Sequence, residues 1–468
     1  MGTATSTGRR RLMVLGVFVI LGVVMGPALA ALAATSPPAG PPTADGSTAA
    51  ALGAGWLVAQ IDAGVPLQVF GSDDWGTTAD AALALAATGV GGGRPATVWD
   101  AIVANRETVV APDDFSGAPP FPDNPGSLAK VILLAHALGE DSRAVGSAPG
   151  EDLVARLEAT LRTSGSDAGL YGAADPTYDG AYRQGLVLLA LTTVGEPVPA
   201  AAIDWLTGQQ CPNGSWIAYR PDTSVPCPTE GFPSPETNAT ASAVVGLVRS
   251  GSTGPVEPAL DWLASVQNDD GGWGFLAGDG TDPNSTAVVL SALATAGVGD
   301  QGRFAGGTTA LLSFQLGCAD AAADRGSFTF PDTGGKANLY ASVQAVAGAL
   351  ELPLPLSSAE KLVPGLPAVD CTTTTTSSTS TTSTTSTSTT STTTTSLPSV
   401  TTSSTPAATV RSASEVASVT GSSSTTAASS GSTLALTGGE AGPPVATGLV
   451  LLVAGVLLMA LRRRTGAR

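Results

Sequence analysis

The chain between residues 47 and 370 alternates nearly apolar segments with amphipathic ones. Six apolar segments are rich in alanine and leucine, and the first five end in a glycine. They span residues 78–89, 127–139, 181–195, 239–251, 285–297 and 338–352. A glycine in this position is typical of a helix C-terminus, where the backbone turns to positive φ. Because these segments are apolar on nearly every side, we predict six buried helices.

Each apolar segment follows an amphipathic one, so the pattern predicts six helical hairpins with one outer and one inner helix each. The amphipathic segments span 48–60, 96–107, 151–162, 201–210, 258–267 and 308–316. The closing glycines of the first five repeats are 50, 56, 56 and 46 residues apart, which indicates a repeat protein. Six hairpins allow an open solenoid or a closed ring. Small residues in the inner helices favour closure, so we predict an all-α fold, an α6/α6 toroid over residues 47–370.

Residues 1–34 have the order of charge and hydrophobicity that is typical of a signal peptide. Three arginines at 9–11 precede an apolar run at 12–24, and small residues follow up to Ala34. Such a segment is removed when the chain is exported. We therefore expect the helical body to be secreted.

The C-terminal residues 434–468 predict an anchor. An apolar run of 17 residues at 445–461 is followed by three arginines, and its length is at the short limit for a membrane helix. Before it stands the pentapeptide Leu434, Ala435, Leu436, Thr437, Gly438. This order of elements resembles the sortase sorting signal of Gram-positive surface proteins, in its L-A-x-T-G variant.

The resemblance implies that a sortase cleaves between Thr437 and Gly438 and joins the threonine to an amine of a cell-wall precursor. The alternative is a plain membrane tail with a chance pentapeptide. Residues 371–433, between body and anchor, are almost entirely Ser, Thr and Ala and have little apolar surface to bury. We expect a disordered stalk there.

The charge of the chain excludes one class of partner. It has 21 Lys and Arg against 38 Asp and Glu, a formal net charge of -17, so we expect no nucleic-acid partner. The single histidine, His136, lies within an apolar helix and no D-x-C segment accompanies it. We therefore expect no metal site and no cofactor.

Four cysteines are consistent with export, and they allow three pairings. We favour Cys211 with Cys227, which bracket a short insertion, and Cys318 with Cys371. The second bridge would fix the end of the body to the ring before the stalk begins.

Two repeats share a sharper motif between the outer and the inner helix, Q-x3-G-x-W. Its residues are Gln210, Gly214 and Trp216 in one repeat, and Gln267, Gly271 and Trp273 in the next. The motif resembles the glutamine–tryptophan motif of the terpene cyclase and protein prenyltransferase toroids, which include squalene-hopene cyclase. Weaker copies stand at 73–75, 169–171 and 326–328.

The residue types of this motif suit a structural corner. Glycine permits a tight turn, the Gln side chain can satisfy free amides at a neighbouring helix start, and the indole excludes water. We therefore interpret Asp269 and Asp270, inside the second copy, as turn acids near a helix N-terminus rather than as a catalytic pair.

The resemblance also implies where catalysis would lie. Class II cyclases of this family protonate an alkene with the middle Asp of a D-x-D-D-T-A segment. The nearest match here is 282–287, in which Asn284 and Ser285 stand where two acids would be. The chain also has length for one toroid only. We therefore assign no catalytic residue and expect a toroid that binds a ligand without catalysis.

Polar positions on the inner helices are the candidates for a ligand cavity. They are Asp80, His136, Tyr182, Arg183, Asn238, Asn284, Tyr340 and Gln344. Vitamin B12 carriers also use an α6/α6 toroid, although they pair it with a β domain that is not evident here, so a small apolar or corrin-like ligand is one hypothesis for this cavity.

Two alternatives remain open. Many glycan hydrolases and lyases are α/α toroids, so the chain could be a wall-exposed enzyme acting on glycans or isoprenoids. Asp73 with Asp74, or Asp113 with Asp114, could supply its acid and base. Neighbouring residues point in different directions, however, and exposed tryptophans at the rim would be needed to strengthen this reading. The other alternative is a passive adhesion module that contacts a surface glycan.

Overall fold

The computed structural model describes residues 45–69, 71–112, 122–147, 149–172, 180–218, 220, 222–228 and 234–371. The predicted signal peptide, the stalk beyond Cys371 and the sorting signal lie outside these residues. Within the described ranges, no helix has both the length and the apolar character needed to cross a bilayer.

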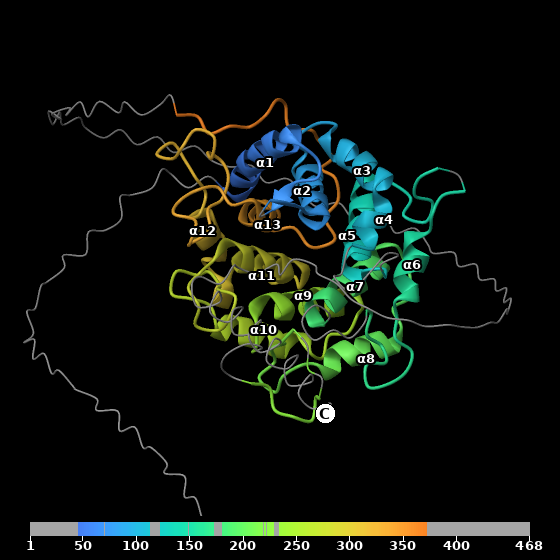
Figure 1. Ribbon diagram of the computed structural model, residues 1–468. Coiled ribbons are helices and arrows are strands. Elements are labelled where there is room, and N and C mark those ends of the chain that lie inside the picture. Colours follow the sequence, from blue (N-terminus) through green and yellow to red (C-terminus); the bar gives the residue numbers. More distant parts are fainter. Residues whose placement is uncertain are drawn as a thin grey trace, which may run out of the picture. The chain divides into compact units, whose positions relative to one another are not determined.

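Six helices form an inner ring (Figure 1). They are α2 (Trp75–Thr88), α5 (Pro125–Leu138), α7 (Ala181–Thr193), α9 (Thr237–Arg249), α11 (Pro283–Thr295) and α13 (Leu339–Ala349). Each packs against the next along the chain, and α13 packs against α2, which closes the ring. The predicted closed ring of six inner helices is therefore present among the described residues.

The remaining helices lie outside this ring. They are α1 (Gly46–Ala63), α3 (Arg94–Ala104), α4 (Arg106–Val110), α6 (Leu153–Ala159), α8 (Ala200–Gly208), α10 (Val256–Ser265) and α12 (Gly307–Leu312). Helix α1 packs against both α13 and α2, and the others pack against the inner helices of their own or the neighbouring hairpin. A short 3-10 turn, η1 (Gly302–Phe304), precedes α12, and strands β1 (Gln68–Val69) and β2 (Ser72–Asp73) form an antiparallel pair before α2.

Local sequence sets both ends of the inner helices. The five closing glycines, from Gly89 to Gly297, all have φ between 70° and 79°, as predicted. At the other end, the side chains of Asp74, Asn124, Asp282 and Asn338 each accept a hydrogen bond from a backbone N–H in the first turn. These caps satisfy donors that a helix start otherwise leaves unpaired.

The two tryptophans of the Q-x3-G-x-W motif are completely buried. Their indole N–H groups donate to backbone carbonyls of the preceding outer helix: Trp216 to Leu206 and Trp273 to Leu263, both at 2.8 Å. Gly214 has a φ of 91°, and a Cβ atom there would lie 2.1 Å from the carbonyl oxygen of Pro258. Each corner thus fixes an outer helix, an inner helix and the start of the next outer helix.

The glutamine of the motif has a different role from the one predicted. Gln210 Nε2 donates to the carbonyl oxygens of Gly214 (2.8 Å) and Pro255 (2.9 Å). Gln267 Nε2 likewise donates to Gly271 (2.6 Å) and to Phe304 (3.1 Å). The side chain therefore pairs carbonyl groups, not the free amides of a helix start.

Two further corners make the same bridge with glutamines that lie elsewhere in the sequence. Gln315 Nε2 donates to Gly326 (2.9 Å) and to Ala49 (2.8 Å). In the other corner, Gln184 Nε2 donates to Gly169 (2.9 Å) and Ala202 (3.1 Å). The copies at 169–171 and 326–328 are thus complete in space, although a loop or an inner helix supplies the glutamine.

The predicted weak copy at 73–75 is wrong. In the sharp copies the backbone N–H of the motif aromatic donates to a hydroxyl of the inner helix, as Trp273 does to Thr286 Oγ1 (3.0 Å). In the first repeat Leu67 makes this bond, to Thr78 Oγ1 at 2.8 Å. Trp75 is instead the first residue of α2, because the β1–β2 hairpin separates it from the corner.

Asp269 and Asp270 are exposed in the loop between α10 and α11, and an added Cβ at Gly306, the N-cap of α12, would lie 3.8 Å from the carbonyl oxygen of Asp270. Asp270 Oδ1 accepts hydrogen bonds from the N–H of Gly272 (3.0 Å) and from Thr281 Oγ1 (2.6 Å). This is the geometry of a turn acid.

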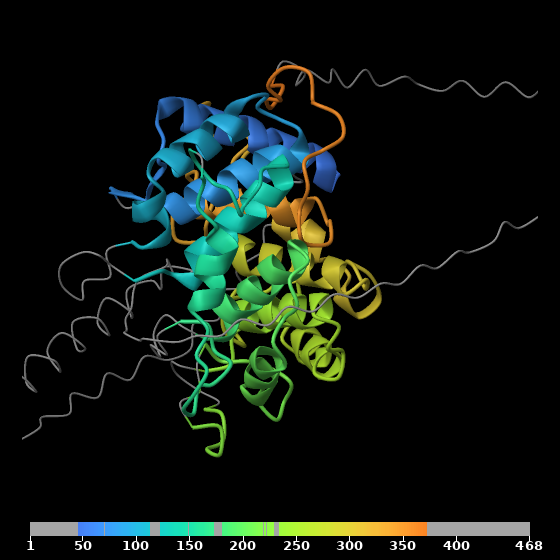
Figure 2. The same ribbon diagram turned by 90° about the vertical axis from the view of Figure 1, so that its right-hand side faces the viewer.

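Both disulfides join the favoured pairs, Cys211 with Cys227 and Cys318 with Cys371. The second bridge holds the end of a segment that the sequence pattern did not predict. We call residues 351–371, which follow α13, the strap (orange in Figure 2).

The strap crosses the end of the inner ring at which the helices finish. Backbone N–H groups of Ser358, Ala359 and Val363 donate to carbonyls of Ala137, Ala86 and Gly89, at the ends of α5 and α2. Leu354 N–H donates to Thr295 Oγ1 in the last turn of α11 at 2.9 Å. The strap thus spans three inner helices.

Candidate functional site

A cavity of about 140 Å³ lies inside the inner ring. All six inner helices line it, and so do Leu354 and Leu356 of the strap. Most of its polar side chains lie nearer the starts of the inner helices, and most of its large apolar side chains lie nearer their ends.

The polar part of the wall centres on an ion pair. Lys130 Nζ on α5 lies 2.5 Å from Asp80 Oδ2 on α2, and Tyr182, Ser242 and Gln344 complete this layer. Burial raises the pKa of Asp80, although Lys130 opposes the rise. Burial works to lower the pKa of Lys130, but the carboxylate of Asp80 and other nearby groups outweigh it and raise that pKa. Each of these two buried groups therefore has a partner that offsets its charge.

Apart from Ser291, whose hydroxyl donates to the carbonyl oxygen of Ala287 at 3.1 Å, the rest of the wall is apolar. Its large side chains are Leu83, Leu133, Leu186, Leu189, Val245, Val288, Val343, Leu354 and Leu356. Leu186 and Val288 are half-buried, and Leu356 is 3% exposed. The leucines of the strap therefore complete the apolar end of the cavity.

Three of the predicted cavity residues line the wall: Asp80, Tyr182 and Gln344. Lys130 was missed, although a lone lysine inside the apolar segment 127–139 was a visible signal. A charged residue is rarely buried without a partner, so its presence in a buried helix predicts a nearby acid.

Asn238, Asn284 and Tyr340 do not line this cavity. Asn284 precedes the wall residues Ala287 and Val288 by three and four positions, so it lies on the same helix face one turn closer to the helix start. Asn238 and Tyr340 are related in the same way to the wall residues of α9 and α13.

Two of these side chains form hydrogen bonds with neighbouring helices near the starts of the inner helices. Asn284 Nδ2 donates to Gln344 Oε1 at 3.0 Å, and Tyr340 Oη donates to Asp74 Oδ2 at 2.5 Å. Asn238 is 1% exposed. The sequence therefore identified the helix face that lines the cavity but placed the cavity one turn too close to the helix starts.

Two further predictions of cavity residues were wrong. His136 is exposed in the last turn of α5, while its neighbours Ala135 and Ala137 are buried, so its side chain faces solvent. Arg183 is 6% exposed on α7 but follows Tyr182 directly, so it points to a different side of the helix from the wall residues Tyr182 and Leu186.

Two buried acids stand at equivalent positions before α9 and α11. Burial raises the pKa of Glu236 to about 8 and that of Asp282 to about 6. Asp282 uses a carboxylate oxygen to cap α11 through Ser285 N–H at 2.8 Å. Glu236 makes no such cap and is 6% exposed, so no cap offsets the rise that burial causes in its pKa.

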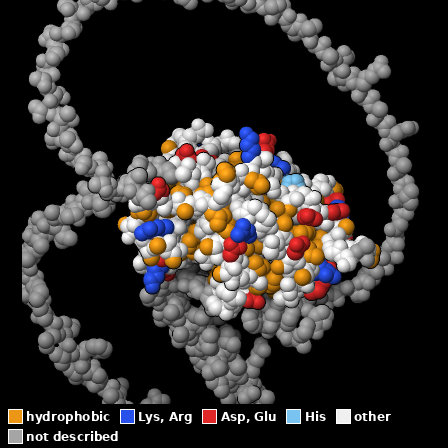
Figure 3. Space-filling model, turned by 90° about the horizontal axis from the view of Figure 1, so that it is seen from above, with side chains coloured by type: hydrophobic (Ala, Val, Ile, Leu, Met, Phe, Trp, Pro, Cys, Tyr) orange, Lys and Arg blue, Asp and Glu red, His pale blue; other side chains and the backbone are white. Residues whose placement is uncertain are grey.

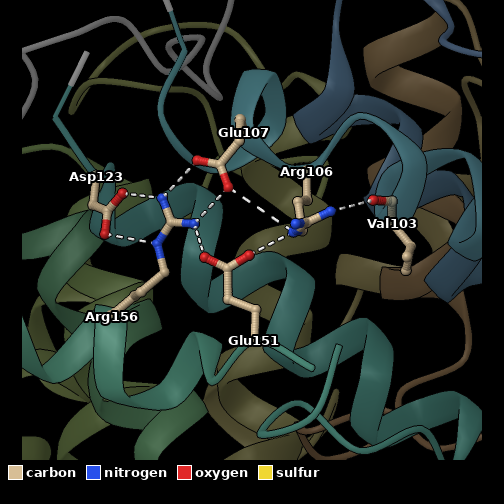
Figure 4. A network of polar contacts seen from close by, with 6 residues as sticks. All are labelled: Val103, Arg106, Glu107, Asp123, Glu151 and Arg156. Atoms are coloured by element: carbon tan, nitrogen blue, oxygen red, sulfur yellow. Dashed lines mark hydrogen bonds and ion pairs between the residues drawn. The ribbon is translucent and has the colours of Figure 1, made fainter. Parts of the chain in front are cut away.

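A larger group of charges lies on the outer side, between α4 and α6 (Figure 4). Arg156 pairs with Asp123, Glu107 and Glu151, and Arg106 pairs with Glu151 at 2.5 Å. Two guanidinium groups thus form ion pairs with three carboxylates. Across the described ranges, no group of three or more His, Cys, Asp or Glu side chains is arranged to hold a metal ion. We interpret the cluster as a structural link between outer helices.

The glycan-enzyme alternative gains no support from its residues. Asp74 caps α2 and is bonded by Tyr340, whereas Asp73 is exposed on β2, so the two do not face a common site. Asp113 and Asp114 lie outside the described residues. All seven tryptophans are buried or half-buried, so none forms an exposed aromatic platform.

The surface of the body is mixed in character. On the face shown in Figure 3, apolar and uncharged polar side chains are interspersed, and basic side chains lie beside acidic ones. The surface in this view offers no single-sign patch for a charged partner.

No family model matches the chain, and no curated protein does. Solved structures with similar chain traces include ent-copalyl diphosphate synthase from Streptomyces platensis (18% identity, TM-score 0.34). They also include an unsaturated glucuronyl hydrolase from Bacillus sp. GL1 (14%, 0.45) and haptocorrin in complex with Cbi (12%, 0.32).

These matches cover 64%, 67% and 67% of this chain, and 50%, 97% and 65% of the three proteins, respectively. At such scores no property of these proteins carries over to this chain. The ring described above rests on its own helix contacts.

Proposed function

We propose that this chain displays an α6/α6 toroid whose cavity binds one small, mainly apolar molecule that carries a single polar group. The observation that supports this most is the division of the cavity wall. One layer holds Asp80, Lys130 and Gln344, and the rest is mainly apolar down to Leu356. A ligand with one polar end matches both parts.

The volume of the cavity limits the size of the ligand. An engineered apolar cavity of about 150 Å³ binds benzene, so a cavity of this size suits about six to ten carbon atoms. Pockets for larger ligands are typically about 300 to 1,000 Å³. The volume of about 140 Å³ therefore favours the small apolar ligand over the corrin-like one.

The charges of Asp80 and Lys130 indicate which polar group the ligand should carry. Asp80 and Lys130 neutralise each other at 2.5 Å, so a charged ligand would bring an unpaired charge into a buried site. A hydroxyl group can both donate to the carboxylate and accept from the ammonium. We therefore propose an uncharged alcohol.

A chain-length series tests this. Primary alcohols from 1-butanol to 1-decanol are added to the full chain, and the melting temperature is measured. We expect stabilisation that rises to an optimum between six and ten carbons and then falls, because longer chains no longer fit. Stabilisation that is absent, or that rises without an optimum, would contradict the proposal.

We propose that this toroid does not cyclise isoprenoids. Asn284 and Ser285 stand in the position of the family acids, Asp282 caps α11, and the cavity is too small for squalene. Incubation of the protein with squalene should give no cyclised product. Turnover that persists after replacement of Asp279 and Asp282 would show that an acid elsewhere does this chemistry.

We also propose that the body is exported and anchored to the cell wall by a sortase, with the membrane as its place if sorting fails. The sequence 434–438, the apolar run and the arginine tail support this, and two disulfides are consistent with an exported body. Thr437→Ala should move the protein from the wall fraction to the membrane or the medium. Unchanged covalent attachment to the wall would contradict the sorting proposal.

A further inference from the structure

We propose that the strap, residues 351–371, is the gate of the cavity, and that the Cys318–Cys371 bridge controls how often it opens. This inference concerns the regulation of the cavity and rests on the proposed function for its ligand. It follows from a comparison of how the two ends of the inner ring are closed.

The end at which the inner helices begin is closed by the helices themselves. Tyr340 on α13 bonds the Asp74 cap of α2, Asn284 bonds Gln344, and Ser242 Oγ donates to the carbonyl of Tyr182 at 2.7 Å. Each bond joins two neighbouring members of the ring. Opening this end requires the helices to separate.

The other end is closed by the strap. Its Leu354 and Leu356 are the cavity-lining residues that do not belong to an inner helix. Ser358 bonds Ala137 through its backbone N–H and its hydroxyl, the latter at 2.6 Å. Displacement of the strap would expose the apolar part of the cavity while every inner helix stays in place.

The strap is packed only in part: an added Cβ at Gly55 of α1 would lie 2.0 Å from the carbonyl oxygen of Pro367, but several apolar side chains of the strap are exposed. The described residues include four large apolar side chains that are exposed, and three of them belong to the strap: Leu352 (42%), Leu362 (71%) and Leu366 (53%). A segment with few buried apolar contacts and several backbone bonds near solvent opens locally at low free energy. The strap therefore opens more readily than the ring.

Both ends of the strap are fixed, which makes it a tethered gate. At its start, Glu351 has a φ of 51° and its carboxylate accepts from Thr308 Oγ1 at 2.6 Å. At its end, Cys371 is bonded to Cys318. Removal of that bridge would free one end of the strap and leave the other attached to α13.

A buried thiol reports on access to the cavity without any ligand. All four native cysteines are in disulfides, so Ala84→Cys introduces a single free thiol in the cavity wall. Its rate of reaction with a small methanethiosulfonate is measured in the full chain. We expect the rate to rise about tenfold when Cys318→Ser and Cys371→Ser are added, because the strap then opens more often.

Two controls make this experiment decisive. Cys211→Ser with Cys227→Ser removes the other bridge, and Tyr340→Phe removes a bond at the opposite end of the ring. Both should leave the rate within about twofold of its starting value. Equal acceleration by both bridge deletions, acceleration by Tyr340→Phe alone, or no acceleration by any variant would overturn the gate.

Hydrogen exchange of the unaltered chain gives a second test that does not depend on variants. The amides of Leu354, Ala359 and Val363 should exchange at least about tenfold faster than those of Trp273 and Phe328 at the corners. Slower or equal exchange of the strap would overturn the proposal.

The ligand experiment separates this proposal from the proposed function. With 1-octanol as the probe, removal of the Cys318–Cys371 bridge should raise the association and dissociation rates together and leave the Kd unchanged. If the unaltered chain binds no alcohol, the proposed function fails, and the thiol and exchange experiments still decide whether the strap is a gate.

Discussion

The two ends of the inner ring are built in different ways. Where the inner helices begin, four of the six have a side-chain cap, and hydroxyl or amide side chains bond the corners, as Thr286 does for Trp273. Where the helices end, a segment from outside the repeats closes the ring, with Leu356 facing the cavity. One end is thus part of the repeated architecture, and the other is an added cover. The predictions below test whether the two ends differ in stability as this comparison requires.

The largest effect is expected at the corners. Trp273→Ala removes a completely buried indole and its bond to Leu263, and should cost about 3 to 5 kcal/mol of unfolding free energy. Trp216→Ala should behave alike, because its indole makes the equivalent bond to Leu206. Thermal or urea unfolding measures both. Two tryptophan variants with near-native melting temperatures would contradict the structural role of the corners.

The next effect concerns the buried acid before α9. The pKa of Glu236 is raised from 4.5 to about 8 in the folded protein, so the folded state keeps a proton that the unfolded chain loses between these values. Stability should therefore be greatest at low pH in this range and fall by about 3 kcal/mol as pH rises from 5 to 8. Glu236→Gln should remove most of this decline. An identical pH profile in the variant would show that Glu236 is solvated or paired.

A smaller effect is expected at the strap. Leu356→Ala should cost about 1 kcal/mol, because the loss is limited by the free energy that holds the strap on the ring. Leu290→Ala is the matched control within α11, where a leucine that is 1% exposed should cost about 3 kcal/mol. Equal costs for the two leucines in urea unfolding would mean that the strap is as firmly integrated as the ring.

The smallest effect is expected for the exposed acids of the corner. Asp269→Asn with Asp270→Asn should cost about 1 kcal/mol or less, since asparagine can still accept the bonds from Gly272 and Thr281. The melting temperature should shift far less than in Trp273→Ala. A large loss of stability would show that these charges do more than shape a turn.

Much of the ring was predictable because its signals are local and repeated. The closing glycines, the alternation of helices and the Q-x3-G-x-W corners each recur within the sequence, and they indicated the hairpins and the buried tryptophans. The corners at 169–171 and 326–328 were recognised only as weak copies, since their glutamines, Gln184 and Gln315, make the same bridge from a different distance along the chain. The corners share the same hydrogen-bond geometry, but the number of residues between the glutamine and the glycine differs.

The cavity was predictable only in part. Helical spacing identified the face that carries Asp80, Tyr182 and Gln344, but depth along the ring depends on how side chains such as Asn284 and Tyr340 pair across helices. The strap has no repeat, no helix and no periodicity, so no pattern indicated that Leu354 and Leu356 would line the cavity. Its position depends on contacts with helix ends more than 200 residues earlier, such as that between Ser358 and Ala137.

The central claim, that the cavity binds a small apolar alcohol, is tested most directly by titration calorimetry of the full chain with 1-octanol. We expect one saturable site with a negative heat-capacity change, which is the mark of apolar burial. Ala347→Leu, which fills a partly accessible position of the wall, should abolish the binding heat while the protein stays folded. No saturable heat in the unaltered chain, or undiminished binding in Ala347→Leu, would contradict the claim.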